Sequence, residues 1–287
     1  MGEMVYLNGR LIQRKKATIS ALDYGFLYGF GLFETMRAYK GKVFRLDEHI
    51  NRLTASAKVL DLSIDKIELK DAVMDIMKAN RLGDARVRIT LSSGEGAISA
   101  DTCTCKKSTV LVVAERYIPY TEQVYRDGFR AIISSYRRNS GSLLLGLKST
   151  SYLMSVMAKQ EARIAGADEA ICLNEKGLLA EASMSNVFMA VDGVLKTPGL
   201  ESGILPGITR QVVLALASQM GINCFEGDLE LGDIYKAQEA FLTSSLLEIM
   251  PLTMVVDKRI GEGGVGDITK KLAVAYKQLV SSELSIV

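Results

Sequence analysis

Hydrophobic residues recur along this chain with two different periods. Where they return every three or four positions, the pattern predicts amphipathic helices. Where β-branched residues gather in short runs, often alternating with polar ones, it predicts strands, and Asn8-Gly9 between two such runs predicts a tight hairpin. The elements expected before residue 115 are hairpins over 5–12 and 33–45, helices over 46–60 and 69–77, and strands over 85–91 and 109–113.

The stretch 115–128 interrupts this pattern, because it is polar and contains Pro119. We therefore predict an interdomain linker there, between a small domain over 1–114 and a larger domain over 129–287. The larger domain is expected to contain a strand over 129–134, a helix over 152–165, an antiparallel meander over 169–197, a helix over 208–220, a strand over 239–244 and a final helix over 269–279. Helices beside a largely antiparallel or mixed sheet predict an α+β fold in two domains.

The composition narrows the class of protein. Hydrophobic residues make up 48% of the 287 positions and charged residues 24%, which is typical of a globular chain with a sizeable core. A net charge of +2 predicts no attraction to nucleic acid or to anionic membranes, and scattered basic pairs such as Arg137-Arg138 are expected to be solvated. Because no apolar run approaches the roughly 20 residues that span a bilayer and no secretory pattern is present, we expect a cytoplasmic protein. The single histidine and the four cysteines, which form no CxxC pair, predict no metal site.

The first candidate for chemistry is Lys148, which lies within an apolar run over 143–154. An unpaired ammonium group is costly to bury, and burial favours its neutral form. A neutral lysine is suited to forming a Schiff base with an aldehyde such as that of pyridoxal 5′-phosphate (PLP). The alternative is an ordinary lysine whose stem covers apolar neighbours while its ammonium group reaches water.

Two downstream features favour the catalytic interpretation. A PLP enzyme needs a lysine for the aldehyde, an acid beside the pyridine nitrogen and an anion site for the phosphate. Glu181 is a candidate for the acid. Pro206-Gly207 precedes a predicted helix at Ile208, and the unpaired first N–H groups of a helix are a suitable phosphate site.

The order of these features resembles the class IV aminotransferase family, the fold-type IV PLP enzymes, whose members include D-amino-acid aminotransferases. The resemblance extends over nearly the whole chain. It rests on Lys148 and on the stretches 23–29, 31–35, 49–53, 181–188, 203–210 and 242–252.

The resemblance implies a role for each matching residue. Lys148 would hold PLP and move protons, and Glu181 would pair with the pyridine nitrogen. The remaining cofactor contacts would come from Arg52, Ile208, Thr209, Ser244, Ser245 and Tyr152, and substrate contacts from Tyr28, Phe33 and Arg88. Arg88 has an equal alternative as a solvated strand residue, and Asn186 is expected to shape a turn. Because the site in relatives lies between the domains and is closed by a partner subunit, the resemblance also implies a homodimer.

The choice of reaction depends on Thr35. Branched-chain aminotransferases usually have Phe-Glu-Gly where this chain has Phe33-Glu34-Thr35, which is similar to 4-amino-4-deoxychorismate lyases. The resemblance thus implies a lyase that releases p-aminobenzoate and pyruvate for folate biosynthesis, with Thr35 assisting proton transfer. The alternative is an aminotransferase for branched-chain or other amino acids that uses 2-oxoglutarate. A D-amino-acid specificity is disfavoured, because 94–99 lacks both Arg and His. A catalytically inactive binding relative is the third hypothesis, disfavoured by the intact candidate residues.

Overall fold

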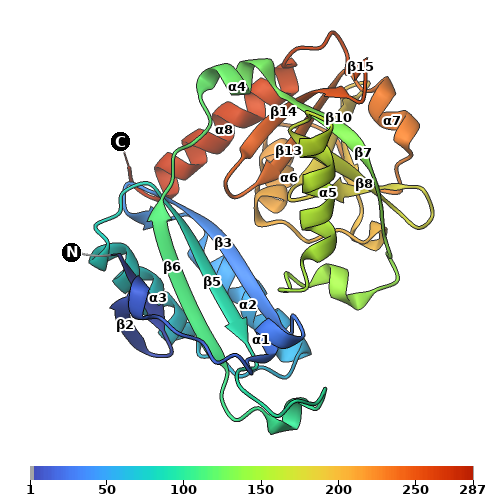
Figure 1. The fold of residues 1–287 in the computed structure, drawn as a ribbon. Helices are drawn as coiled ribbons and strands as arrows, with labels where there is room; N and C mark the ends of the chain where they lie inside the picture. Colours follow the sequence, from blue (N-terminus) through green and yellow to red (C-terminus); the bar gives the residue numbers. More distant parts are fainter. Residues whose placement is uncertain (1–2, 287) are drawn as a thin grey trace. The chain divides into compact units, whose positions relative to one another are not determined.

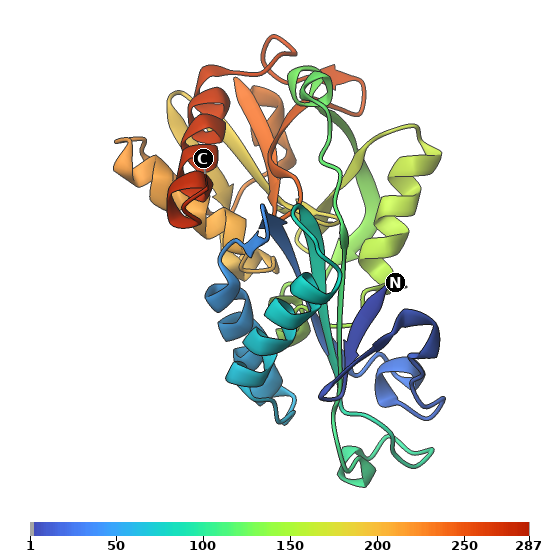
Figure 2. The ribbon, with the colours of Figure 1, turned by 90° about the vertical axis from the view of Figure 1, so that its left-hand side faces the viewer.

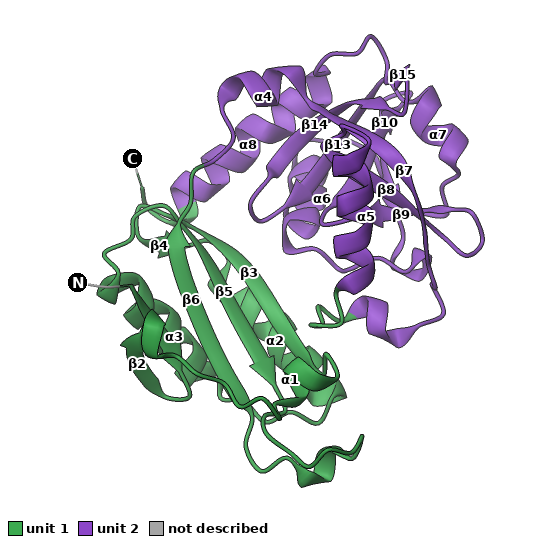
Figure 3. Ribbon diagram, viewed as in Figure 1, with its two compact units in different colours: residues 1–118, 147–152, 283–287 green, residues 119–146, 153–282 purple. Residues whose placement is uncertain are grey.

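The structure is a computed structural model that describes residues 3–286 and divides into two compact units (Figures 1 and 3). Among the described residues, unit 1 contains 3–118, 147–152 and 283–286. Unit 2 contains Pro119–Gly146 and Leu153–Ser282. No helix in the described part of the chain is long and apolar enough to cross a membrane.

Unit 1 is an antiparallel sheet with helices on one face. The strand order is β2-β1-β6-β5-β3-β4, and every neighbouring pair is antiparallel. Its strands are β1 (Met4–Leu7), β2 (Arg10–Gln13), β3 (Gly31–Tyr39), β4 (Lys42–Val43), β5 (Ala85–Ser92) and β6 (Thr109–Arg116). The helices α2 (Leu46–Val59) and α3 (Lys66–Ala79) cover the same face of this sheet (Figure 2), whereas α1 (Tyr24–Leu27) is a single turn.

The elements predicted for this unit are present. The hairpin at Asn8-Gly9 is confirmed, since both turn residues have positive φ angles, 49° and 88°. The apolar faces of α2 and α3 pack on the sheet through residues that are almost fully buried, among them Ile50, Val73 and Ile76. The helical period in the sequence therefore marked the side of each helix that faces the sheet.

Unit 2 is built on a nine-stranded mixed sheet. Its main order is β12-β11-β10-β13-β14-β7-β8-β9, and β15 pairs with β14. The strands are β7 (Phe129–Arg138), β8 (Glu169–Asn174), β9 (Leu179–Ala182), β10 (Asn186–Val191), β11 (Val194–Pro198), β12 (Cys224–Gly227), β13 (Glu239–Ser244), β14 (Glu248–Val255) and β15 (Lys258–Arg259). The helices are α4 (Glu122–Asp127), α5 (Leu153–Ile164), α6 (Ile208–Gln219), α7 (Leu231–Lys236) and α8 (Asp267–Glu283). Parallel strands β7 and β8 are joined through α5, and β14 pairs in parallel with β7.

The antiparallel meander predicted over 169–197 is wrong. Two local pairs do form, β8 with β9 and β10 with β11, but β10 takes β13 rather than β9 as its other neighbour. The short turn after β9, closed by a hydrogen bond from the Ala182 N–H to the Ser185 carbonyl, redirects the chain between the two pairs. Hydrophobic alternation identified the strands, but it does not determine which distant strand completes the ladder.

The region between the predicted domains also differs from expectation. Strand β6 continues to Arg116, and the stretch expected to be a linker contains α4, whose N-cap is the Thr121 hydroxyl. Residues 147–152, predicted to belong to the C-terminal domain, cluster instead with unit 1. The reason is main-chain pairing: the Phe33 N–H donates to the Lys148 carbonyl, and the Thr150 N–H donates to the Gly31 carbonyl, both at 2.8 Å.

Candidate functional site

Lys148 lies beside β3 in unit 1, and its side chain faces aromatic rings. The pairing of the Lys148 carbonyl with the Phe33 N–H fixes the main chain at this point. The Lys148 Nζ atom lies 4.7 Å from the centre of the Phe33 ring and 5.9 Å from that of Tyr152. The two rings pack edge to face with their centres 5.1 Å apart. The half-buried Lys148 ammonium group is thus in contact with ring faces, which attract a cation.

The predicted substrate residues Thr35 and Arg88 share this face of the sheet. Phe33 and Thr35 are two positions apart on β3, so their side chains point the same way, and Arg88 of β5 is the direct partner of Thr35. The Arg88 guanidinium carbon lies 3.8 Å from the centre of the Phe33 ring. Desolvation lowers the pKa of Arg88, although an arginine is still charged at neutral pH. Tyr28, also predicted here, packs on Tyr24 with ring centres 4.9 Å apart.

Arg52 is held by a carboxylate on the opposite face of β3. Glu34 is completely buried and accepts 2.7 Å hydrogen bonds from Arg52 Nε and Nη2. His49 Nδ1 donates to the same carboxylate at 2.7 Å. Burial alone would raise the pKa of Glu34, but the charge of Arg52 and the hydrogen bonds from His49 and Arg52 outweigh it and lower the pKa to about 2. This ion pair fixes the orientation of the Arg52 guanidinium, and no motif in the sequence predicted it.

Glu181 of β9 is buried in unit 2 and is surrounded by donors. Arg138 Nη2 lies 2.9 Å from Glu181 Oε1, while Asn186 Nδ2 and the Leu205 N–H donate to Oε2 at 2.9 and 3.0 Å. The expectation that Arg138 is solvated is wrong, because the side chain is buried and its Nε donates to the Gly203 carbonyl. Extending the alternation of the strand predicted over 129–134 would have placed Arg137, not Arg138, on the inward face; the pairing of β7 with β8 shifts register between Ile133 and Arg137, and Arg138 is the buried residue.

Asn186 connects the other predicted residues of unit 2. Its Nδ2 also donates to the Leu205 carbonyl, and its backbone pairs with Thr243, the residue before Ser244 and Ser245. Gly207, the N-cap of α6, comes so close that a Cβ there would lie 2.0 Å from Asn186 Oδ1. Asn186 therefore does more than shape a turn, since it links the Glu181 carboxylate to the start of α6 and the end of β13.

The start of α6 presents backbone N–H groups near these residues. Ile208 and Thr209 form its buried first turn, and among the described residues no side chain caps the helix. Uncapped first-turn N–H groups and the positive end of the helix dipole favour an anion. At the end of β13, Ser244 Oγ accepts a hydrogen bond from the Leu247 N–H at 3.2 Å, which makes a tight turn that includes Ser245. In the part of the chain that the structure describes, no cluster of three or more His, Cys, Asp or Glu residues could hold a metal ion.

These features coincide with a match to a known family. A family described as "Amino-transferase class IV" matches residues 31–255, most of the chain. The chain belongs to the class IV aminotransferases. This family uses PLP, so the predictions of the family, of the α+β fold, of a PLP enzyme and of its cofactor are confirmed.

Individual relatives within this family differ in their reactions. A Methanocaldococcus jannaschii protein named "Putative branched-chain-amino-acid aminotransferase" is 42% identical over 278 residues, which are 96% of each chain. The aminodeoxychorismate lyase of Bacillus subtilis is 36% identical over 283 residues, 97% of this chain and 95% of that one. A solved branched-chain aminotransferase of Thermoproteus uzoniensis with norvaline has a TM-score of 0.91 at 36% identity, covering 98% of this chain and 95% of that one. These relatives support the aminotransferase alternative better than the lyase that Thr35 had favoured.

The buried Glu34 carboxylate predicts how stability depends on pH. The pKa of Glu34 falls from 4.5 to about 2 in the folded protein. The ionised carboxylate therefore makes its full contribution to the free energy of unfolding above pH 4.5, and this contribution is lost as the pH falls through about 2. Glu34→Gln should lower the free energy of unfolding by about 3 kcal/mol at pH 7, because Arg52 loses its buried counter-charge. Urea unfolding of the unmodified protein and the Glu34→Gln variant between pH 8 and pH 3 measures this difference in free energy. The difference should be constant from pH 8 to pH 4.5 and should shrink below pH 4.5. A difference that stays the same down to pH 3 would contradict the assignment.

Proposed function

We propose that this chain is a PLP-dependent aminotransferase that acts on amino acids with apolar, branched side chains. The observation that carries the proposal is the group formed by Lys148, Phe33, Tyr152 and Arg88 on one face of the unit 1 sheet. It combines an amine, two aromatic surfaces and a guanidinium. Arg88 suits a substrate carboxylate, because guanidinium groups bind carboxylates with two parallel hydrogen bonds, and the rings suit an aliphatic side chain.

The residues of this chain fit the cofactor. The buried Glu181 carboxylate, paired with Arg138 at 2.9 Å, suits a protonated pyridine nitrogen. The uncapped start of α6 suits the phosphate, as do Ser244, Ser245 and the preoriented Arg52. Gly207 allows the start of α6 to approach Asn186 more closely than any side chain would permit, which keeps this helix start beside Glu181. When bound, PLP supplies an electron sink for the substrate carbon next to the amino group.

The side chains then have separate roles. Lys148 holds the cofactor through Nζ and afterwards carries a proton on the same atom to and from the substrate carbon. Glu181 keeps the pyridine nitrogen protonated, and Arg138 and Asn186 position Glu181. Glu34 and His49 position Arg52. Tyr152 packs against Phe33 and so limits the positions that Lys148 Nζ can take.

Lyase activity is the second candidate. Thr35 presents a hydroxyl on the same face as Phe33, opposite Arg88, where branched-chain aminotransferases usually have glycine. The Bacillus subtilis lyase also aligns over almost the whole chain. In the lyase reaction Thr35 donates or accepts a proton during release of pyruvate, while Lys148 and Glu181 keep the roles they have in the aminotransferase reaction.

A homodimer is also proposed. Helix α5 leaves Leu153 71% exposed on the same side as the exposed Val156 and Met157, and Leu143 before it is 86% exposed. Contiguous exposed apolar residues of this kind mark protein interfaces. A second copy of the chain is the partner that the family resemblance implies.

Reduction with borohydride tests the role of Lys148. The purified protein should absorb as a PLP enzyme, and after reduction peptide mapping should find the pyridoxyl group on Lys148. Lys148→Ala should abolish turnover while its circular dichroism spectrum and unfolding midpoint stay close to those of the unmodified chain. Lys159→Ala, a surface lysine on α5, is the matched control and should retain turnover. A pyridoxyl group on any other lysine would rule out the assignment.

Parallel assays separate the two reactions. One assay measures 2-oxoglutarate-dependent transamination of Leu, Ile, Val and D-Ala, and the other measures p-aminobenzoate release from aminodeoxychorismate. We expect transamination of the three branched L-amino acids to dominate, and Thr35→Gly to increase it by opening the pocket. If p-aminobenzoate release dominates instead and Thr35→Val lowers it about 10²- to 10⁴-fold, the lyase is the correct function, because that is the contribution of a positioned proton donor.

Sedimentation velocity tests the dimer. The protein should sediment at twice the monomer mass at assay concentrations, because an obligate interface of this type buries about 2,000 Å² or more. Leu153→Glu with Met157→Glu should shift it toward monomer by placing charges in the apolar surface. A fully active monomer of the unmodified protein would exclude the proposal.

A further inference from the structure

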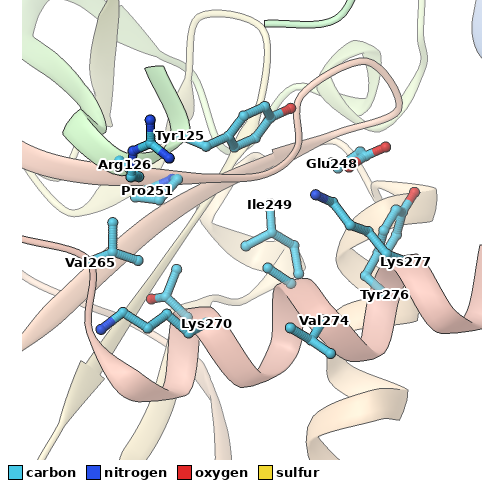
Figure 4. Close-up of a pocket in the computed structure, with 12 residues that line it drawn as sticks. Tyr125, Arg126, Glu248, Ile249, Pro251, Val265, Lys270, Val274, Tyr276 and Lys277 are labelled. Carbon is cyan, nitrogen blue, oxygen red and sulfur yellow. The ribbon is translucent and has the colours of Figure 1, made fainter. Parts of the chain in front are cut away.

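Unit 2 contains a cavity of about 480 Å³ that none of the proposed cofactor or substrate residues line (Figure 4). It lies among α8, α4 and β14, and its size is within the range of small-molecule sites. Its lining residues are Tyr125, Arg126, Glu248, Ile249, Pro251, Val265, Thr269, Lys270, Ala273, Val274, Tyr276 and Lys277.

One face of α8 gives the cavity an apolar middle and charged ends. Lys270, Ala273, Val274 and Lys277 follow at intervals of three and four residues, so they lie along one side of the helix. Val274 is 56% exposed although it is aliphatic. The two lysines are two helical turns apart, which corresponds to about 10 Å along the axis. A ligand that matches this face has a polar end and an apolar part several carbon atoms long.

The charges at the two ends of the cavity differ. In Figure 4, Lys277 lies toward Glu248, whereas Arg126 and Lys270 lie toward the other end, beside Val265. Glu248 is the one acidic residue among the lining residues, so the lining at the Arg126 and Lys270 end contributes only cations. Both cations do have partners, Glu122 and Asp267, but at 3.7 Å on the surface. Such exposed pairs contribute little, so a ligand carboxylate can join them.

We propose that this cavity binds an amphipathic carboxylate, with the carboxylate at Arg126 and Lys270 and an aliphatic tail along Ile249 and Val274. The tail would cover the exposed part of Val274 and contact Pro251 and Ala273. Removing this apolar surface from water supplies most of the affinity, and the cationic end selects an anion over an amine or an alcohol.

Occupancy of the cavity is coupled to the turn after β13. The hydroxyl of Tyr125, which lines the cavity, donates to the Leu247 carbonyl at 3.0 Å. The N–H of the same Leu247 donates to Ser244 Oγ. A ligand packed on Tyr125 therefore stabilises the turn that carries Ser244 and Ser245. This coupling to cofactor binding rests on the proposed function, whereas the binding of the carboxylate does not.

Calorimetric titration of the purified holoenzyme with octanoate tests the site. We expect saturable binding with one site per chain, and binding at least about tenfold weaker for octylamine and 1-octanol. Lys270→Glu should weaken octanoate binding about tenfold, because it reverses a charge at the carboxylate end. Lys271→Glu is the matched control: it makes the same change at the next residue of α8, which does not line the cavity, and should leave the affinity unchanged. Ala273→Trp should abolish binding by filling the cavity.

Equal affinities for the Lys270→Glu and Lys271→Glu proteins, or no saturable binding of octanoate, would overturn the site. The coupling has its own measurement, the rate at which PLP leaves the holoenzyme. Saturating octanoate should slow it about fivefold or more in the unmodified chain, and Tyr125→Phe should remove this effect while octanoate still binds. An effect that persists in Tyr125→Phe would overturn the coupling. If the protein carries no PLP, the proposed function fails, but the titration with octanoate still tests the site.

Discussion

A carboxylate that is removed from water has to be matched by charge and by hydrogen-bond donors, and each unit contains such a group among or beside the predicted site residues. In unit 2 the buried Glu181 accepts from Arg138, Asn186 and the Leu205 N–H, so β7, β10 and the segment before α6 each have to present a donor at one point. In unit 1 the buried Glu34 requires Arg52 and His49 from α2. Loss of one partner would leave the other buried and unpaired, which costs more than the pair itself contributes.

The contacts that stabilise these two buried carboxylates also position the side chains around them. The hydrogen bonds that stabilise the Glu34 carboxylate are the same ones that orient Arg52, and those that Glu181 accepts fix the position of its carboxylate. Asn186 extends the second network, because its amide also fixes Leu205 and because Gly207 approaches it too closely for any side chain. The start of α6 is thereby held beside the carboxylate without a capping side chain among the described residues, which leaves its N–H groups available to an anion.

The cavity beside α8 differs from these two networks of charged residues because most of its wall is apolar. Its walls are aliphatic and aromatic, with cations at the edge and Glu248 as the one acidic lining residue. Two of its lining residues hydrogen-bond to the rest of unit 2: Tyr125 donates to the main chain of Leu247, and Thr269 donates to Glu239.

The sequence by itself determined the elements and the chemical type of most candidate residues. Hydrophobic period placed α2, α5, α6 and most strands, because local burial patterns are set by neighbours in the chain. Lys148, Glu181 and the helix start at Ile208 were identifiable from their motifs, which also led to the family. Only the tertiary structure decided that β10 pairs with β13, that residues 147–152 join unit 1, and that Arg138 is buried against Glu181. Each of these depends on contacts between residues far apart in the sequence, and the chemical nature of a residue does not specify which distant partner will neutralise or pair with it.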